Sequence, residues 1–168
     1  TGICFIGERN FRKFLMNYIP VKEGDIKTYD GRTLGRHCGL MYYTIGQRKG
    51  LDIGGQAGDA GRWFVIEKDM KNNILYVAHG EEDKLYSKGL ITGKINFIPE
   101  VPSEKEFECY AKFRYRQDDQ KVSVKVRSDG STEVVFAEKQ RAITEGQYCV
   151  FYDDEKCLGG GVIEKALF

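Results

Sequence analysis

Apolar residues near the start of the chain follow two different spacings. Residues 1–7 read Thr-Gly-Ile-Cys-Phe-Ile-Gly, an extended apolar segment that carries Cys4 between two glycines. From Phe11 to Ile19, apolar residues recur at i, i+3, i+4, i+7 and i+8, which is the spacing of one face of an α-helix. Asn10 can cap the N-terminus of that helix, and Pro20 ends it. The pattern therefore predicts a short amphipathic helix directly after the cysteine-bearing segment.

The stretch that follows, up to residue 87, consists of short β-like pieces separated by turns. Asp30-Gly31 is a dipeptide typical of tight hairpin turns. Runs of aromatic and β-branched residues between such turns are typical of strands. The expected elements are a β piece at residues 26–29, a strand at residues 39–45, a hairpin of residues 63–67 with 74–78, and one helical turn at residues 81–86.

From residue 88 onward, short strands follow one another at regular spacing with turn residues between them and no helical period. Such a run favours a small closed or nearly closed antiparallel β-barrel. We therefore expect a mainly β fold with one or two short helices, in which a small central α+β domain at residues 1–87 precedes a C-terminal β-barrel at residues 88–168. The candidate strands are residues 90–97, 106–116, 121–127, 132–136, 141–143, 148–152 and 157–164, and Gly159-Gly160-Gly161 in the last of them suggests a bulge or a close backbone contact.

Strand alternation over residues 106–116 separates an apolar face from a basic one. Cys109 and Phe113 fall on the apolar face, and Arg114 falls on the opposite face with other cations. Cations next to aromatic rings suit contact with phosphates and stacking on bases. Tyr115 shares the parity of the apolar face, so it either packs in the core or lies at the barrel rim.

Composition and charge narrow the class of protein. The 168 residues are 41% hydrophobic and 30% charged, an ordinary globular composition. No apolar run is long enough to span a bilayer, and we expect no membrane association. Five cysteines without a CxxC pair suggest neither a zinc site nor a disulfide scaffold, so we expect no metal and a reducing, cytoplasmic location. The chain begins with Thr inside an apolar segment, which we interpret as a cut through a longer protein.

The net charge of +1 conceals a basic stretch. Residues 31–50 contain four basic residues and no acidic one. Within it, residues 46–51 form a glycine-bracketed loop that carries Arg48, Lys49 and an amide. Such a loop lets backbone and charge approach a polyanion closely. Nucleic acid is one possible partner, but basic patches are also common on ordinary solvated surfaces.

Several stretches together resemble one family, the tRNA-specific 2-thiouridylases. They occur in the order expected for the family and extend over essentially the whole chain. Asp52 departs from the family, which often has a small residue there. The matching stretches are TGICFIG at residues 1–7 with FRKFL after it, GQRKGL at 46–51, FRYRQ at 113–117, Gly146-Gln147 before a Val-Phe-Tyr strand, and CLGGGVI at 157–163.

The resemblance implies a reaction and a set of site residues. A family enzyme has an N-terminal ATP-pyrophosphatase domain, a central domain and a C-terminal β-barrel. It adenylates the C2 oxygen of the wobble uridine with ATP and replaces that oxygen with sulfur delivered as a persulfide by a donor protein. Cys4 matches the family's persulfide-carrying cysteine, and nearby arginines favour a thiolate or persulfide anion. The predicted tRNA-binding residues are Arg114, Tyr115 and Gln147, with Arg48 and Lys49 as further candidates.

The resemblance also implies that this chain lacks the ATP-binding domain, so we expect no bound ATP and no activity from it alone. The alternative is a non-catalytic RNA-binding β-barrel module. A cysteine hydrolase built on Cys4 and His37 is disfavoured, because no partnering Asp or Asn and no oxyanion glycine pattern accompanies these two residues.

Overall fold

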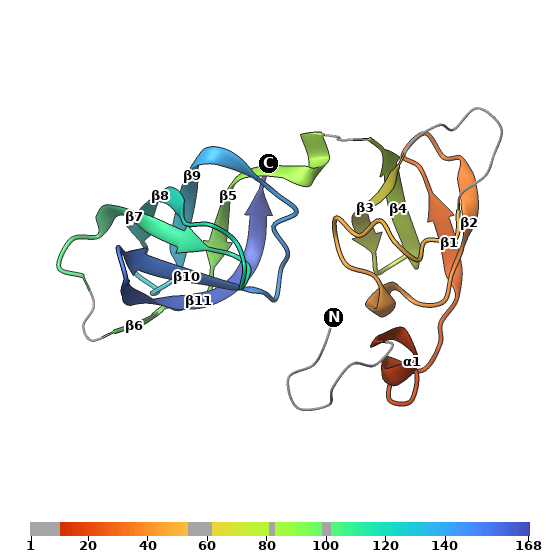
Figure 1. Ribbon diagram of the computed structural model, residues 1–168, viewed down its shortest axis with the longest axis horizontal. Helices are drawn as coiled ribbons and strands as arrows, with labels where there is room; N and C mark the ends of the chain where they lie inside the picture. The colour runs from red at the N-terminus through yellow and green to blue at the C-terminus, as the bar shows by residue number, and fades with distance from the viewer. Residues whose placement is uncertain (1–10, 54–61, 81–82, 99–101) are drawn as a thin grey trace. The chain divides into compact units, whose positions relative to one another are not determined.

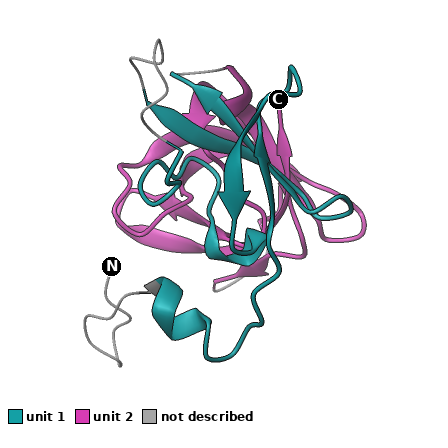
Figure 2. Ribbon diagram, turned by 90° about the vertical axis from the view of Figure 1, so that its right-hand side faces the viewer, with its two compact units in different colours: residues 1–81 teal, residues 82–168 magenta. Residues whose placement is uncertain are grey.

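The computed structural model describes residues 11–53, 62–80, 83–98 and 102–168. The chain divides into two compact units, residues 1–81 and 82–168, shown by colour in Figure 2. This division lies between residues 81 and 82, whereas the sequence placed the domain boundary between 87 and 88. Figure 1 labels the elements of both units, each of which is described by itself below.

The first unit opens with helix α1, Phe11–Leu15. The helix is confirmed but ends earlier than predicted, because the carbonyl of Leu15 accepts hydrogen bonds from both Tyr18 (2.9 Å) and Ile19 (2.9 Å) and the chain tightens into a turn before Pro20. The expected cap at Asn10 lies outside the described residues.

A four-stranded sheet with the order β2-β1-β4-β3 forms the body of this unit. β1 and β4 are parallel, and the other two pairs are antiparallel. The expected turn at Asp30-Gly31 and the hairpin of β3 with β4 are confirmed, and Gly31 has φ 91° as the turn requires. Ile26, Val65 and Leu75 are fully buried in the sheet's core. The strands are β1 Gly24–Lys27, β2 Thr33–His37, β3 Trp63–Asp69 and β4 Ile74–His79.

The strand predicted at residues 39–45 is wrong. A short 3-10 helix, η1 Leu40–Tyr42, occupies this position, and Gly39 enters it with φ 145°. Leu40, Tyr42 and Tyr43 are buried while Met41 is 48% exposed. The tyrosine hydroxyl of Tyr42 donates to the carbonyl of Ile19 and fastens the turn after α1. The prediction rested on the aromatic and β-branched residues of this segment, several of which pack into the core here from a short turn rather than from a strand.

The second unit is a six-stranded antiparallel closed β-barrel, as predicted. Its strands run in the order β10-β7-β8-β9-β5-β11, and pairing of β10 with β11 closes the barrel. Figure 1 shows these strands wrapped around one core. Leu90, Val124, Val134 and Phe151 are fully buried there. The elements are η2 Asp83–Leu85, β5 Tyr86–Thr92, β6 Asn96–Phe97, β7 Glu106–Lys112, β8 Gln120–Val126, β9 Thr132–Arg141, β10 Tyr148–Asp153 and β11 Lys156–Leu167.

Close backbone contact at the glycines of β11 is confirmed. A Cβ added to Gly159, which has φ 133°, would lie 2.2 Å from the carbonyl oxygen of Asn96. At Gly160 it would lie 2.8 Å from the carbonyl oxygen of Cys149. The absence of side chains therefore lets β11 pair with β6 and β10 at the same point along its length.

Several strand predictions in the barrel had incorrect bounds. The single strand expected at residues 90–97 is divided between β5 and β6. β7 stops at Lys112 rather than Arg116, so residues 113–117 form the turn into β8. β9 runs on to Arg141, and the separate strand expected at residues 141–143 is wrong, because the chain leaves the ladder at Ala142, which has φ 54°. Within the described parts of the chain, no helix is both long and apolar enough to cross a membrane.

Candidate functional site

Cys4 lies outside the described residues, so its persulfide role stays a prediction. Arg12, the first basic residue of helix α1, already has partners of its own. The guanidinium of Arg12 lies 3.8 Å from a carboxylate oxygen of Asp52 and 6.0 Å from the ring centroid of Tyr43. Asp52, the family-atypical residue, thus forms an exposed ion pair with the helix.

The four described cysteines are free thiols in different environments. Cys109 and Cys149 are buried in the barrel core, and burial raises the pKa of the Cys109 thiol to about 12 and raises the pKa of Cys149 as well. Neither thiol is ionised near neutral pH, so neither is a nucleophile. Cys38 and Cys157 are partly exposed, and the Sγ atom of Cys38 lies 3.9 Å from the hydroxyl of Tyr43.

His37 is a structural residue. It is 1% exposed, its Nδ1 accepts from the backbone N–H of Gly39 (3.1 Å), and its Nε2 donates to the carbonyl of Asn73 (3.0 Å). Burial lowers the pKa of His37, which keeps the ring neutral. With both nitrogens engaged, this imidazole has no free atom with which to act as a general base.

The loop predicted at residues 46–51 is held by the side chain of Gln47. Its Oε1 accepts from the N–H of Thr44 (3.0 Å), and its Nε2 donates to the carbonyl of Lys49 (2.9 Å). Arg48 and Lys49 are exposed, and no carboxylate in the described part of the chain pairs with either. The loop therefore presents two solvated cations on a fixed backbone.

The same turn recurs in the barrel. In Thr44–Gln47 and Thr144–Gln147, the glutamine N–H donates to the threonine carbonyl (2.9 and 3.3 Å) and the glycine has φ 80° or 83°. In each turn the glycine N–H donates to the carbonyl of one residue of a neighbouring strand, and the N–H of that same residue donates to the glutamine carbonyl. The strand residue is Val65 in the first turn and Ile163 in the second. The side-chain amide of Gln147, unlike that of Gln47, forms no hydrogen bond with the described residues and is exposed.

The barrel brings three of the predicted residues to one end. β7 and β10 are antiparallel, with Val150 opposite Lys112. The turn that follows β7 and the turn that precedes β10 are therefore neighbours. Arg114 and Tyr115 lie in the first turn and Gln147 in the second. Arg48 and Lys49 belong to the other unit.

Arg114 and Tyr115 occupy this turn in different ways. The guanidinium of Arg114 donates to the carbonyl of Ala142 over 2.6 Å, which ties the turn to the β9–β10 connection. Burial, together with the charge of Arg141, lowers the pKa of Arg114. Tyr115 is 95% exposed, so the interpretation of Tyr115 as a core residue is wrong. β7 ends before Tyr115, so the alternation of side chains along a strand does not apply to this residue.

A chain of side-chain amides fixes the turn from inside. Gln117 accepts at Oε1 from the N–H of Phe113 (3.1 Å) and donates from Nε2 to Oε1 of Gln140 (2.8 Å). Gln140, which is 8% exposed, donates onward to Oε1 of Gln120 (2.8 Å) and to the carbonyl of Glu138 (2.9 Å). Both ends of the turn are thereby joined to β9.

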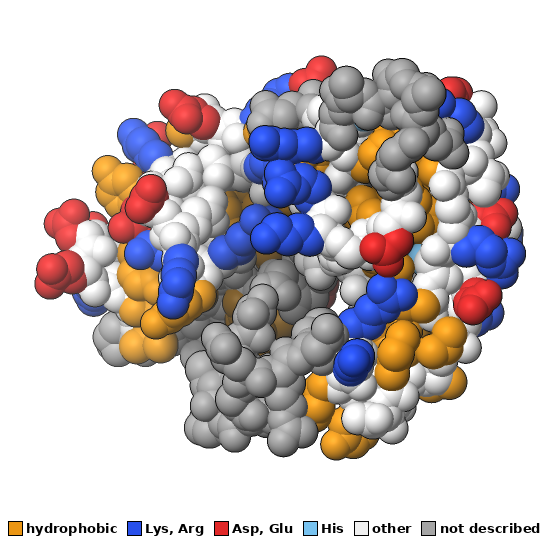
Figure 3. Space-filling model, turned by 45° about the vertical axis from the view of Figure 1, so that its right-hand side comes forward, with side chains coloured by type: hydrophobic (Ala, Val, Ile, Leu, Met, Phe, Trp, Pro, Cys, Tyr) orange, Lys and Arg blue, Asp and Glu red, His pale blue; other side chains and the backbone are white. Residues whose placement is uncertain are grey.

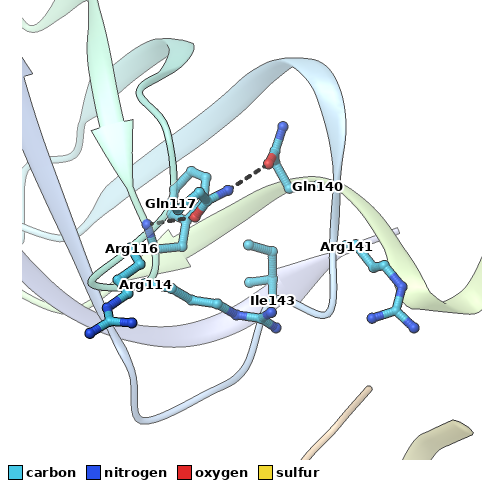
Figure 4. A pocket seen from close by; sticks show the side chains of 7 residues that line it. Arg114, Arg116, Gln117, Gln140, Arg141 and Ile143 are labelled. Atoms are coloured by element: carbon cyan, nitrogen blue, oxygen red, sulfur yellow. Dashed lines mark hydrogen bonds between the residues drawn. The ribbon is translucent and has the colours of Figure 1, made fainter. Parts of the chain in front are cut away.

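Beside the amide chain lies a cavity of about 380 Å³. Figure 4 shows the arginine side chains reaching away from the two glutamines on one side of the cavity. Sequence reasoning selected Arg114 but not the remaining polar lining residues. The cavity is lined by Phe113, Arg114, Arg116, Gln117, Gln140, Arg141 and Ile143.

Figure 3 shows one face of the molecule, on which basic and acidic side chains are mixed. On the face drawn in Figure 3, Lys and Arg side chains form several groups with Asp and Glu side chains scattered among and around them. This distribution agrees with the net charge of +1. Among the described residues, no group of three or more His, Cys, Asp or Glu side chains could hold a metal ion.

Comparison with known proteins gives two domain matches. Residues 12–79 match the family described as tRNA methyl transferase PRC-barrel domain, and residues 87–163 match the family described as aminomethyltransferase beta-barrel domain. A protein of Streptococcus thermophilus named tRNA-specific 2-thiouridylase MnmA is 58% identical over 99% of this chain and 45% of its own length. The protein of the same name from Listeria welshimeri is 58% identical over 98% of this chain and 44% of its own length.

These matches define a chain of two domains, a small sheet domain and a β-barrel, that is similar to about half of a tRNA-specific 2-thiouridylase. The chain belongs to the tRNA-specific 2-thiouridylase family, as the sequence motifs indicated. It spans about half the length of the curated relatives that it matches.

Proposed function

We propose that this chain is the tRNA-binding and sulfur-carrying part of an enzyme that replaces the C2 oxygen of the wobble uridine with sulfur. The observation that carries the proposal is the barrel end, where Arg114, Tyr115 and Gln147 lie together. A guanidinium, an aromatic ring that is 95% exposed and an amide without a hydrogen-bond partner among the described residues match the contacts that RNA offers, namely phosphates, base faces and base edges. The names of the relatives supply the reaction class.

In this proposal Cys4 receives sulfur as a persulfide from a donor protein. ATP supplies the activation of the uridine C2 oxygen through a part of the enzyme other than these residues. A uridine adenylated at C2 is a strong electrophile, so the persulfide anion on Cys4 attacks C2 and AMP leaves with the oxygen. A second cysteine, which the resemblance implies in the ATP-binding domain, then attacks Cys4 Sγ, so that the S–S bond breaks, the sulfur stays on the uridine and the two cysteines form a disulfide. Arg48 and Lys49 add phosphate contacts from the first unit.

The binding half of the proposal is tested with this chain and unmodified tRNA. Arg114→Ala should weaken binding and lower the slope of log affinity against log salt by roughly one unit or less, since one cation–phosphate contact is lost. Tyr115→Ala should weaken binding by about 1–3 kcal/mol with little change in that slope, because stacking is not a charge contact. Unchanged affinity in both variants would remove the barrel end from the interface.

The chemical half requires the full-length enzyme. Cys4→Ser should retain tRNA and ATP binding and lose thiolation, because serine cannot carry a persulfide. Normal thiolation by that variant with a cysteine-dependent sulfur donor would exclude Cys4 as the carrier. In that case this chain would be the tRNA-binding part of the enzyme, without a chemical role of its own.

A further inference from the structure

Helix α1 is attached to the first unit at both of its ends. The helix has five residues, fewer than the about 12–15 that an isolated helix needs in water, so contacts with the rest of the unit hold it. At its N-terminal end, Arg12 pairs with Asp52 (3.8 Å) and forms a hydrogen bond with Cys38. The same guanidinium lies 6.0 Å from the ring centroid of Tyr43. At the other end, Leu15 packs against the buried core of the sheet.

The hydroxyl of Tyr42 fastens the turn that follows the helix. It donates to the carbonyl of Ile19, whose own N–H donates to the carbonyl of Leu15 (2.9 Å). Tyr42 is 6% exposed, and a Cβ added to Gly39 would lie 2.9 Å from its ring, so the ring has one fixed place. A hydrogen bond from a buried, fixed ring holds the turn firmly, whereas the ion pair at the other end of α1 is exposed and contributes little.

This attachment limits how far Cys4 can reach. Cys4 precedes Phe11, the first residue of the helix, by seven residues, and such a stretch spans at most about 25 Å. With α1 detached, the next fixed residue would be Gly24 at the start of β1, twenty residues from Cys4, and the limit would rise to about 70 Å. Confining a reacting group to a small volume raises the rate of its reaction, so a docked α1 favours any step that Cys4 performs.

We propose that Tyr42 is a positioning residue for sulfur transfer, because its hydroxyl docks α1 and thereby confines Cys4, with Arg12 as a weaker second attachment. The proposal rests on the proposed function, in which Cys4 carries the sulfur. Tyr42 acts through the helix and not by contact with the uridine. Activation of the uridine takes place in a part of the enzyme other than these residues, so loss of the Tyr42 hydroxyl should slow sulfur transfer and leave activation as it is.

The docking of α1 is tested with this 168-residue chain. Trypsin cuts after Arg12 and Lys13 only when the helix opens, so the rate of cleavage there measures the open population. Tyr42→Phe removes the hydroxyl, keeps the ring and should speed this cleavage about three- to tenfold. Tyr29→Phe is the matched control, since the hydroxyl of Tyr29 donates to Glu67 in the same unit and not to the turn after α1. It should leave the rate of cleavage unchanged.

The effect on the chemistry is measured in the full-length enzyme with ATP, tRNA and a persulfide donor. In a single turnover, release of pyrophosphate reports activation of the uridine, and formation of 2-thiouridine reports sulfur transfer. Tyr42→Phe should slow formation of 2-thiouridine about three- to tenfold, with tRNA affinity and pyrophosphate release unchanged. Arg12→Gln should slow the same step by about twofold or less, because its ion pair is exposed. Tyr29→Phe should change neither step.

The outcomes separate the two proposals. Unchanged cleavage of α1 in the Tyr42→Phe chain would overturn the positioning role, and so would faster cleavage with a normal rate of 2-thiouridine formation. Equal loss of both steps would show that Tyr42 supports the fold in general, which also overturns it. In these three cases the proposed function stands. If full-length Cys4→Ser thiolates tRNA normally, Cys4 is not the sulfur carrier, and the chemical half of the proposed function fails together with the positioning role.

Discussion

The side-chain amide of Gln117 donates to Oε1 of Gln140 over 2.8 Å, which joins the β7–β8 turn to the end of β9. Gln140 is almost fully buried and uses both of its amide atoms within the protein. An amide in this position stabilises the turn only while its partners are present, because a buried donor or acceptor without a partner is costly.

Gln140→Leu should lower the free energy of unfolding of the barrel by about 1–3 kcal/mol, since the amides of Gln117 and Gln120 lose a partner. Amide hydrogen exchange measures the local effect: the N–H of Phe113, which donates to Gln117, should exchange faster. Lys139→Leu, next to it on β9 and exposed, is the control and should leave that exchange rate as it is. If the N–H of Phe113 exchanges as slowly in the Gln140 variant as in the unchanged protein, the amide chain does not hold the turn.

Acid should destabilise the first unit through His37. Its pKa is lowered in the folded state, so between the folded pKa and the ordinary value near 6.5 the unfolded chain binds more protons. The neutral, buried ring of His37 therefore contributes its full stabilisation above about pH 6.5. As pH falls below that value, the free energy of unfolding decreases by up to about 1.4 kcal/mol per pH unit.

The sole tryptophan, Trp63, lies in the core of this unit and reports its urea unfolding. His37→Gln should flatten the dependence of the unfolding midpoint on pH between about pH 5 and 7, over the range set by the ordinary histidine pKa. His79→Gln, at an exposed position, should keep that dependence. If the His37 variant keeps the original dependence of the unfolding midpoint on pH, another titratable group causes the loss of stability in acid.

Gly159→Ala should destabilise the barrel by at least about 3 kcal/mol, because the residue has φ 133° and its new Cβ would lie 2.2 Å from the carbonyl oxygen of Asn96. Gly146→Ala is the matched control: it has φ 83° with nothing within 4 Å of the added Cβ. Only backbone strain of about 1–2 kcal/mol is expected there. Thermal unfolding followed by circular dichroism measures both, and equal losses would contradict the close approach of β6.

Thiol labelling near neutral pH should distinguish the cysteines. Cys109 and Cys149 should react only after unfolding, because burial raises the pKa of both thiols. Cys4 is predicted to react fastest in the folded chain, and mass spectrometry of labelled peptides gives the order. Full reaction in urea is the control for accessibility. Rapid labelling of Cys149 in the folded chain would contradict the closed barrel core.

The sequence by itself determined the architecture and the family. Turn dipeptides and regularly spaced strands predicted the barrel, because each short apolar run needs a partner on both sides and closure supplies it. The three consecutive glycines of β11 indicated that another backbone segment approaches this strand closely, because residues without a Cβ leave room for it. Ordered motifs such as FRYRQ and GQRKGL identified the family.

Only the tertiary structure decided where β7 stops and what its end carries. Strand alternation placed the side chain of Tyr115 on the core-facing side. The strand ends at Lys112, however, because the side-chain amide of Gln117 accepts the hydrogen bond of the Phe113 N–H there. The same holds for the arginine cavity. Arg116 and Arg141 are separated by two strands in the sequence, and they line one cavity because β8 and β9 pair and return the chain to the same end of the barrel.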